Sequence, residues 1–215
     1  MTPSCRWLAA LLLACSAAMA APPDAAQQAA LERAVQDYES GRIARARAAF
    51  ESLARRGLPA ADYNLAVMNL RGELGRPAPA AAKRRLERAA AAGFVSAQLM
   101  LAQGLESGEL GVRDLQSAVG WYLRAAEGGS VAAQVEAGTA HYLGRGTARD
   151  ATQAARWYRE AAKAGDVGAM YLLASMYEQG DGLERDLRLA RYWYEAAARA
   201  GDPAAPAKLR ELEGF

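Results

Sequence analysis

The chain has 215 residues, of which 26 are basic and 24 acidic, so its formal net charge is +2. A charge so close to zero argues against a nucleic-acid partner, which normally requires a concentrated basic face. Both cysteines, Cys5 and Cys15, lie in the first 20 residues, so the rest of the chain offers no disulfide and no thiolate ligand for a metal.

Residues 1–20 have the pattern of a secretory signal peptide. Arg6 gives a basic start, an apolar run follows, and Ala18-Met19-Ala20 forms a small-residue cleavage site. The apolar run is too short to cross a bilayer as a helix. Cleavage between Ala20 and Ala21 would release the mature chain into the periplasm or envelope of a bacterium.

A second interpretation of the same segment is a lipobox. The stretch Leu-Leu-Ala-Cys that ends at Cys15 fits one, and Cys15 would then carry a lipid and become the first mature residue. The chain would in that case be an outer-membrane lipoprotein. The two interpretations differ in signal peptidase and anchoring, and both predict export.

Helices are predicted almost without interruption after a short linker at residues 21–28. Ala, Leu, Arg and Glu dominate up to about Glu213, and all are favourable helix formers. No stretch shows the apolar–polar alternation of a half-buried strand. The expected fold class is therefore all-α, with no second apolar run long enough to span a membrane.

A period of 36 residues runs through this helical region. It relates Trp121, Trp157 and Trp193, and the tyrosine that follows each of them. Glycines keep the same period at positions 57, 93, 129, 165 and 201. An active site is rarely repeated within one chain, whereas a stacking unit must be, because each repeat buries its apolar face against its neighbours.

Each period is predicted to form two helices, called here helix A and helix B. Helix A of the best repeat is expected over Ala169–Gln179 and ends at Gly180, since glycine accepts the left-handed conformation of a helix exit. Asp186 then stands where the N-cap of helix B belongs, as Asp114 and Asp150 do in the preceding repeats. Pro79 marks the corresponding helix start in the repeat that lacks this aspartate.

The repeat resembles the Sel-one-like repeat family, a relative of the tetratricopeptide repeat. Residues that meet its pattern are Ala169, Leu173, Ala174, Tyr177, Gly180, Gly182, Asp186, Trp193, Tyr194, Ala197, Ala198 and Gly201. Earlier repeats depart from it: His141 stands for the tyrosine, Leu110 for the second glycine, and Arg85 for the tryptophan. The first repeat, with Tyr38 and Phe50, has a shorter turn and looks like a plain tetratricopeptide repeat.

The resemblance implies a right-handed α-solenoid of about five helix-turn-helix repeats with a C-terminal cap. The expected boundaries are a first repeat at 29–57, a degenerate repeat at 58–93, Sel-one-like repeats at 94–129, 130–165 and 166–201, and a capping segment at 202–215. Leu209 and Leu212 are expected to cover the last hairpin, while Lys208, Arg210 and Glu211 face water.

By the same resemblance, the function is that of a non-enzymatic scaffold or adaptor in the cell envelope. It would bind a protein or peptide on a concave face lined by helix A. The predicted contact residues lie outside the repeat's own apolar stripe and are Tyr63, Val67, Leu99, Gln103, Glu136, Thr139, Tyr142, Tyr171, Ser175 and Glu178. Three tyrosines among small polar groups suit a peptide, because tyrosine combines apolar area with a hydroxyl group.

Two other functions are possible for such a chain. An assembly or polysaccharide-export lipoprotein would depend on Cys15. A β-lactamase-like hydrolase would follow cysteine-rich relatives, but the mature chain has no paired cysteines and no S-x-x-K motif.

No catalytic residue, metal or cofactor is predicted. The G-G-S-V-A stretch around Ser130 lacks the preceding strand of a nucleophile elbow, so Ser130 is expected to be an N-cap. His141 is the single histidine and is expected to pack in its helix rather than bind a metal.

Export can be checked by mass spectrometry of the native protein. We expect its first residue to be Ala21, because Ala18-Met19-Ala20 directs cleavage there. An acylated Cys15 as the first residue would establish the lipoprotein instead. A protein that retains Met1 would contradict both.

Overall fold

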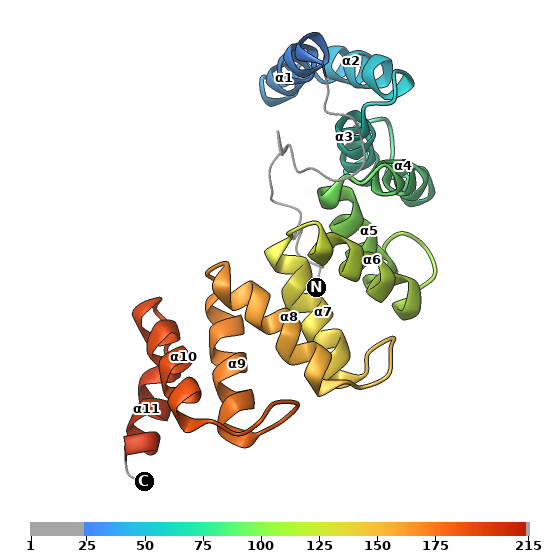
Figure 1. Ribbon diagram of the computed structural model, residues 1–215. Helices are drawn as coiled ribbons and strands as arrows, with labels where there is room; N and C mark the ends of the chain where they lie inside the picture. The colour runs from blue at the N-terminus through green and yellow to red at the C-terminus, as the bar shows by residue number, and fades with distance from the viewer. Residues whose placement is uncertain (1–23, 214–215) are drawn as a thin grey trace. The chain divides into compact units, whose positions relative to one another are not determined.

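The protein is described by a computed structural model, which defines residues 24–213. The signal-peptide prediction for residues 1–20 lies outside these residues. Within 24–213 all regular structure is α-helical (Figure 1). The helices are α1 (Ala25–Glu39), α2 (Ile43–Arg55), α3 (Pro59–Leu70), α4 (Pro79–Ala91), α5 (Val95–Ser107), α6 (Leu115–Glu127), α7 (Val131–Leu143), α8 (Ala151–Lys163), α9 (Val167–Gln179), α10 (Leu187–Arg199) and α11 (Ala205–Glu213).

The chain divides within α5 into two compact units, an N-terminal unit ending at Leu101 and a C-terminal unit beginning at Ala102. In the N-terminal unit α1 packs against α2, α2 against α3, and α3 against α4. In the C-terminal unit each helix from α6 to α11 packs against the next (Figure 1). This consecutive packing is what a solenoid of hairpins requires, and it confirms the predicted all-α class.

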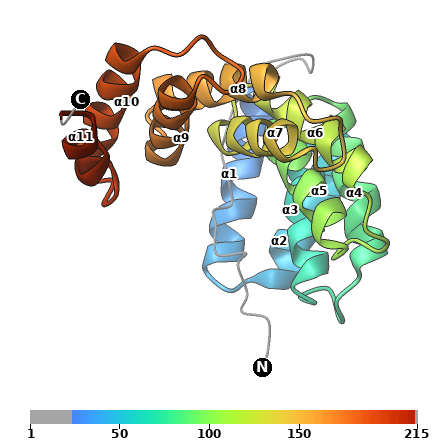
Figure 2. The ribbon, with the colours of Figure 1, turned by 90° about the horizontal axis from the view of Figure 1, so that it is seen from below.

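The N-terminal unit is built around one apolar cluster shared by its first three helices. Phe50 of α2 and Leu65 of α3 are fully buried in it, with Leu31 of α1 against them. Only residues 40–42 separate α1 from α2, whereas residues 180–186 separate α9 from α10 (Figure 2). The predicted short turn of the first repeat is confirmed.

The predicted linker at 21–28 is wrong for its last four residues, which belong to α1. Asp24 and Gln27 form a capping box: the Asp24 carboxylate accepts from the Gln27 amide at 2.7 Å, and the Gln27 side chain accepts from the Asp24 amide at 3.2 Å. These reciprocal bonds satisfy free donors at the helix start and therefore favour helix over an unstructured linker.

The predicted helix caps of the C-terminal unit are confirmed. Asp114, Asp150 and Asp186 each accept a backbone N–H at the start of a B helix. Ser130 does the same for α7, with its hydroxyl 3.3 Å from the Ala133 nitrogen. Its place at a helix start, following a helix, supports capping rather than nucleophilic chemistry.

Two glycines bring successive hairpins of the C-terminal unit into direct backbone contact. A Cβ atom at Gly182 would lie 2.3 Å from the Ala151 carbonyl carbon, and one at Gly146 would lie 2.4 Å from the Leu115 oxygen. Both glycines have positive φ, and both touch the first residue of the preceding B helix. No side chain fits there, so the glycine is required by contact as well as by backbone conformation.

The repeat that lacks this second glycine compensates locally. Leu110 occupies the position and is buried, with its side chain over Gly104. A Cβ at Gly104 would lie 2.4 Å from Leu110 Cδ1, so the glycine inside α5 makes room for the leucine. The leucine at position 110 and the glycine at position 104 therefore compensate for each other.

The paired tryptophan and tyrosine residues of the B helices are packing residues, in keeping with a repeat that buries its apolar face against its neighbours. Tyr122 and Tyr194 are fully buried, Tyr158 and Trp157 nearly so, and Trp193 is half-buried. The Arg156 guanidinium lies 4.7 Å from the Trp157 ring centroid and covers its outer side. The tryptophan of this repeat is therefore enclosed by its own protein.

We expect Trp157→Ala to lower the free energy of unfolding by about 3–5 kcal/mol, because it removes a large buried aromatic side chain. Urea denaturation followed by circular dichroism measures this. Trp193→Ala is the matched control at the equivalent, half-buried position, and its loss should be smaller. Equal losses would mean that burial does not set the role of these tryptophans.

Candidate functional site

Six of the ten predicted contact residues lie on two A helices of the C-terminal unit. Glu136, Thr139 and Tyr142 are on α7, and Tyr171, Ser175 and Glu178 are on α9. Thr139 corresponds to Ser175, and Tyr142 to Glu178, across one period. All six are half-buried, and we call them the α7/α9 face.

On α7 the face is held by a chain of polar contacts. The Arg145 guanidinium lies 2.9 Å from Glu136 and 2.7 Å from Glu106. Glu106 also accepts a hydrogen bond of 2.7 Å from the Tyr122 hydroxyl. One arginine of the turn after α7 thus joins the carboxylates of α5 and α7.

Thr139 is also held in place, by a residue of the adjacent B helix. Its hydroxyl lies 3.1 Å from that of Tyr158 on α8, and it is 2.9 Å from the Val135 carbonyl oxygen within α7. A buried tyrosine of the B helix therefore fixes a polar group on the A helix.

Tyr142 is held by residues of two turns. The Arg149 guanidinium lies 5.6 Å from the Tyr142 ring centroid, and Arg149 pairs with Asp181 at 3.2 Å. The hydrogen bond to Asp181 raises the pKa of Tyr142, with partial desolvation acting in the same direction. The phenol therefore stays neutral and remains a hydrogen-bonding group.

On α9, the residues of the face contact side chains of α10 and α11. Glu178 accepts a 2.7 Å hydrogen bond from the Tyr194 hydroxyl and lies 3.5 Å from the Lys208 amine. The Tyr171 ring lies edge-on to that of Tyr194, with 5.2 Å between centroids. The prediction that Lys208 simply faces water is wrong, because its amine pairs with the Glu178 carboxylate of α9. Leu209 and Leu212 pack on the last hairpin as predicted.

A repeating rule links these contacts. The residue near the end of each A helix, Glu106, Tyr142 or Glu178, meets a charged residue supplied by the next part of the chain. The partners are Arg145, Asp181 and Lys208 in that order. Arg145 and Asp181 occupy equivalent positions in successive turns, whereas Lys208 lies on α11, so the first two junctions recur in position and favour one register of stacking.

A second repeating contact was missed by sequence reasoning. Arg113, Arg149 and Arg185 each donate from Nε to a carbonyl near the end of the preceding A helix, at 2.8, 3.1 and 3.0 Å. A cation placed there satisfies a free carbonyl and opposes the negative end of the helix dipole. The 36-residue spacing of these arginines is visible in the sequence and would have identified them.

The remaining predicted contact residues do not form an exposed row. Tyr63 is only 5% exposed, and its ring packs edge-on against Phe94 at 5.5 Å, so its assignment to an exposed face is wrong. Burial raises the pKa of its phenol. Val67, Leu99 and Gln103 are half-buried.

The described residues contain no group of three or more His, Cys, Asp or Glu side chains that could hold a metal ion. His141 is half-buried in α7, as expected, and its Nδ1 has no hydrogen-bond partner in residues 24–213. The α7/α9 face therefore presents hydroxyls, carboxylates and aromatic edges, which suit recognition of a polar chain by hydrogen bonding.

A sequence profile of the Sel1 repeat matches this chain four times, at residues 59–94, 95–130, 131–166 and 167–202. These boundaries differ by one residue from those predicted for the four later repeats. The second repeat, predicted to be degenerate, is among the matches. No curated protein gives a significant match to the sequence.

Solved structures with the same fold include a protective antigen present in uropathogenic Escherichia coli strains, which displays an SLR fold. It is 29% identical with a TM-score of 0.78, over 85% of this chain and 40% of the antigen. A Sel1 repeat protein from Oxalobacter formigenes is 31% identical with a TM-score of 0.70, over 78% of this chain and 49% of that one. This chain thus spans less than half the length of either relative.

Tyr122 provides a pH-dependent test of the buried tyrosine contacts. Desolvation, and then its hydrogen bond to Glu106, raise the pKa of the phenol above the ordinary 10.0. The unfolded chain loses this proton at about pH 10, while the folded chain keeps it to higher pH. The stabilisation is therefore complete below about pH 10 and is lost as the pH rises through the folded pKa.

We expect the free energy of unfolding to fall between about pH 9 and pH 11, and to fall less steeply in Tyr122→Phe, which has no proton to lose. Urea denaturation at the two pH values measures both slopes. Tyr192→Phe, at a tyrosine that is 54% exposed, is the matched control and should behave like the parent. Identical slopes for all three proteins would contradict the assignment.

Proposed function

Because the chain belongs to the Sel1 repeat family, we propose that it is a non-enzymatic adaptor of the bacterial envelope that binds a peptide or protein segment on the α7/α9 face. Sel1 repeat proteins are generally protein-interaction scaffolds, and the similar structures are repeat scaffolds that are generally non-enzymatic. The choice of face and location is our inference from the residues of this chain.

The observation that carries the choice of face is that its polar groups are held in place yet remain half exposed. Arg145 orients Glu136, Tyr158 orients Thr139, and Tyr194 orients Glu178. A side chain fixed before binding loses less conformational freedom when a partner arrives. The supporting tyrosines are buried in the core, so the repeat's own packing prepares the face.

The chemistry of the face favours a segment that supplies both hydrogen-bond donors and apolar groups. The carboxylates of Glu136 and Glu178 accept hydrogen bonds, the Thr139 hydroxyl, which donates to Val135, can accept one, and the Ser175 hydroxyl can donate or accept. Tyr171, half-buried on α9, offers ring area beside them. A peptide backbone with interspersed apolar side chains meets these requirements.

Location in the envelope rests on the sequence of residues 1–20 alone. Arg6, the apolar run and Ala18-Met19-Ala20 support export, and Cys15 supports the lipoprotein form of the same proposal. In residues 24–213 no helix combines the length and the apolar character needed to cross a membrane.

The face can be tested by site-specific photo-crosslinking in the native cell. A photoreactive residue at Tyr171 or Ser175 is expected to capture one protein at a stoichiometry that Tyr142→Ala reduces. The same photoreactive residue at Arg156 or Glu160, both exposed on the backing helix α8, is the positional control. We expect little capture from α8.

Tyr192→Ala, an exposed tyrosine on α10, is the matched control for Tyr142→Ala and should leave capture unchanged. Tyr142 and Tyr171 pack at the edges of their clusters, so thermal unfolding of each variant must be measured in parallel. Equal capture from α8 and α9 in folded protein would contradict the proposed face.

A further inference from the structure

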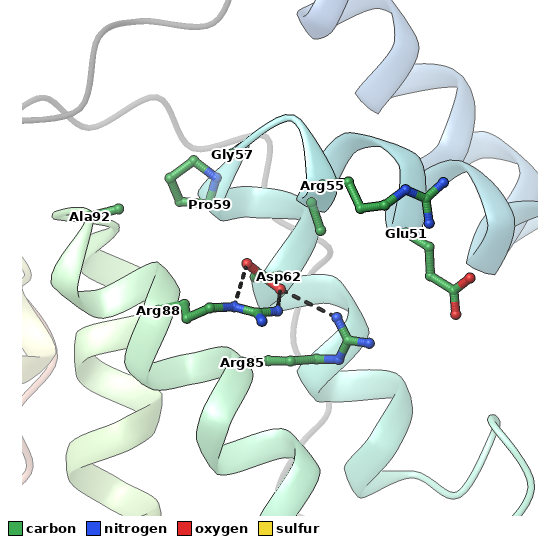
Figure 3. Close-up of a pocket in the computed structure, with 9 residues that line it drawn as sticks. Glu51, Arg55, Gly57, Pro59, Asp62, Arg85, Arg88 and Ala92 are labelled. Atoms are coloured by element: carbon green, nitrogen blue, oxygen red, sulfur yellow. Dashed lines mark hydrogen bonds and ion pairs between the residues drawn. The ribbon is translucent and has the colours of Figure 1, made fainter.

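The N-terminal unit contains an open pocket that the repeat pattern does not explain. It has a volume of about 560 Å³ and lies among α2, the start of α3, and α4 (Figure 3). Pockets of this size can hold a small molecule or a few atoms of a longer ligand. Its lining includes Arg55, Asp62, Arg85 and Arg88, with Glu51 at the edge.

Asp62 is the buried centre of this group. Asp62 is only 6% exposed, and its carboxylate faces two arginines of α4 (Figure 3). Arg88 Nε lies 3.2 Å from Oδ2, and Arg85 Nη1 lies 3.3 Å from Oδ1. A buried carboxylate with two guanidinium partners fixes both forks in a defined position.

The equivalent positions of other repeats carry different residues with a different task. Gln98 and Gln134 correspond to Asp62, and each donates its amide to a carbonyl near the end of the preceding B helix. An aspartate carboxylate has no proton to donate in this way. Asp62 instead turns to α4, where Arg85 stands in place of the repeat's tryptophan.

The two departures are therefore coupled. The next two repeats have glutamine and tryptophan at these positions, whereas this repeat has an acid and an arginine that bind one another. At the tryptophan position of a later repeat, Trp157 is buried and fills its site. Here the site is open and lined by cations.

The pocket retains positive charge after its internal pairs are counted. Asp62 offsets one charge of Arg85 and Arg88, and Glu51 is paired with Arg47 at 2.8 Å. Arg55 makes no ion pair within residues 24–213. Three arginines, Arg55, Arg85 and Arg88, thus line the pocket together with the carboxylates of Asp62 and Glu51.

The donors needed for an anion remain available. Each guanidinium has five N–H groups, and Asp62 uses only part of those of Arg85 and Arg88. The Arg88 side chain is 62% exposed, so its outer N–H groups reach solvent. Leu58, the N-cap of α3 between the lining residues Gly57 and Pro59, provides no side-chain acceptor for the helix amides, unlike Ser130 and Asp166 at the corresponding helices.

We propose that this pocket binds an oxyanion, the carboxylate or phosphate group of a ligand, between Arg55, Arg85 and Arg88. Guanidinium forks match both groups in a bidentate manner. The Asp62 carboxylate orients the forks and limits the net charge, which disfavours unspecific binding to polyanions. The site lies wholly in the N-terminal unit and is independent of the function proposed for the α7/α9 face.

The test uses arginine side-chain Nε–Hε NMR signals of the purified protein. Sodium phosphate and sodium glutarate are titrated separately at constant ionic strength set with chloride. The Arg55, Arg85 and Arg88 signals should shift saturably with at least one anion. Whichever anion binds more tightly identifies the group as phosphate or carboxylate.

Three variants complete the experiment. Arg55→Gln, at an exposed residue without a packing role, should raise the dissociation constant by roughly tenfold, the loss expected for a charged hydrogen-bonding partner. Arg84→Gln, exposed on the same helix as Arg85 but outside the pocket lining, is the matched control and should bind as the parent does.

The double variant D62Q/R85W introduces the residues that the next two repeats have at these positions, and it should abolish binding while the helix content is kept. Either loss, with Arg84→Gln unaffected, supports the site. Failure of both anions to shift the three signals would overturn the proposal. So would anion binding that Arg55→Gln and D62Q/R85W leave unchanged.

Discussion

The stacking of the C-terminal unit depends on contacts between the backbone of one turn and the helix of the repeat before it. Gly146 lies against Leu115, and Gly182 against Ala151, so closely that a Cβ atom would overlap main-chain atoms. The contact fixes where the next hairpin begins. Glu136 and Tyr142 of the α7/α9 face depend on this spacing, because the charged residues beside the glycines, Arg145 and Asp181, contact them.

Glycine and alanine give each repeat the same backbone geometry. Polar contacts then distinguish one junction between repeats from the next. Glu106 meets Arg145, and Glu178 meets Lys208. The equivalent residues differ in charge, so a hairpin shifted by one repeat would place the Asp181 carboxylate against that of Glu106 and bring two like charges together. The buried tyrosines beneath them connect this polar layer to the core, since Tyr122 and Tyr194 are enclosed while their hydroxyls bind the same glutamates. Stability and the shape of the proposed binding face thus come from the same residues.

Features that recur every 36 residues could be predicted from the sequence. The helix pairs, the aspartate caps and the packing role of Trp157 all follow from periodicity and known cap chemistry. Features that belong to one repeat could not. The burial of Tyr63 depends on Phe94 lying against it, and the position of Lys208 depends on Glu178 of another helix. The sequence shows Arg85 only as a departure from the repeat pattern. Its ion pair with Asp62 could not be predicted, because it depends on the structure placing the two side chains next to each other.

The central claim, that backbone contact at the second glycine sets the stacking, is tested most directly by comparing two alanine substitutions in the same unit. Gly129 has a φ of +87° and no atom within 4 Å of the place that a Cβ would take, whereas Gly182 has a φ of +71° and meets Ala151. Gly129→Ala should cost about 1–2 kcal/mol of unfolding free energy, the strain of a left-handed alanine. Gly182→Ala should cost about 1–3 kcal/mol more, since the hairpins must move apart. Equal losses in urea denaturation would contradict the account and leave backbone conformation as the only role of the glycine.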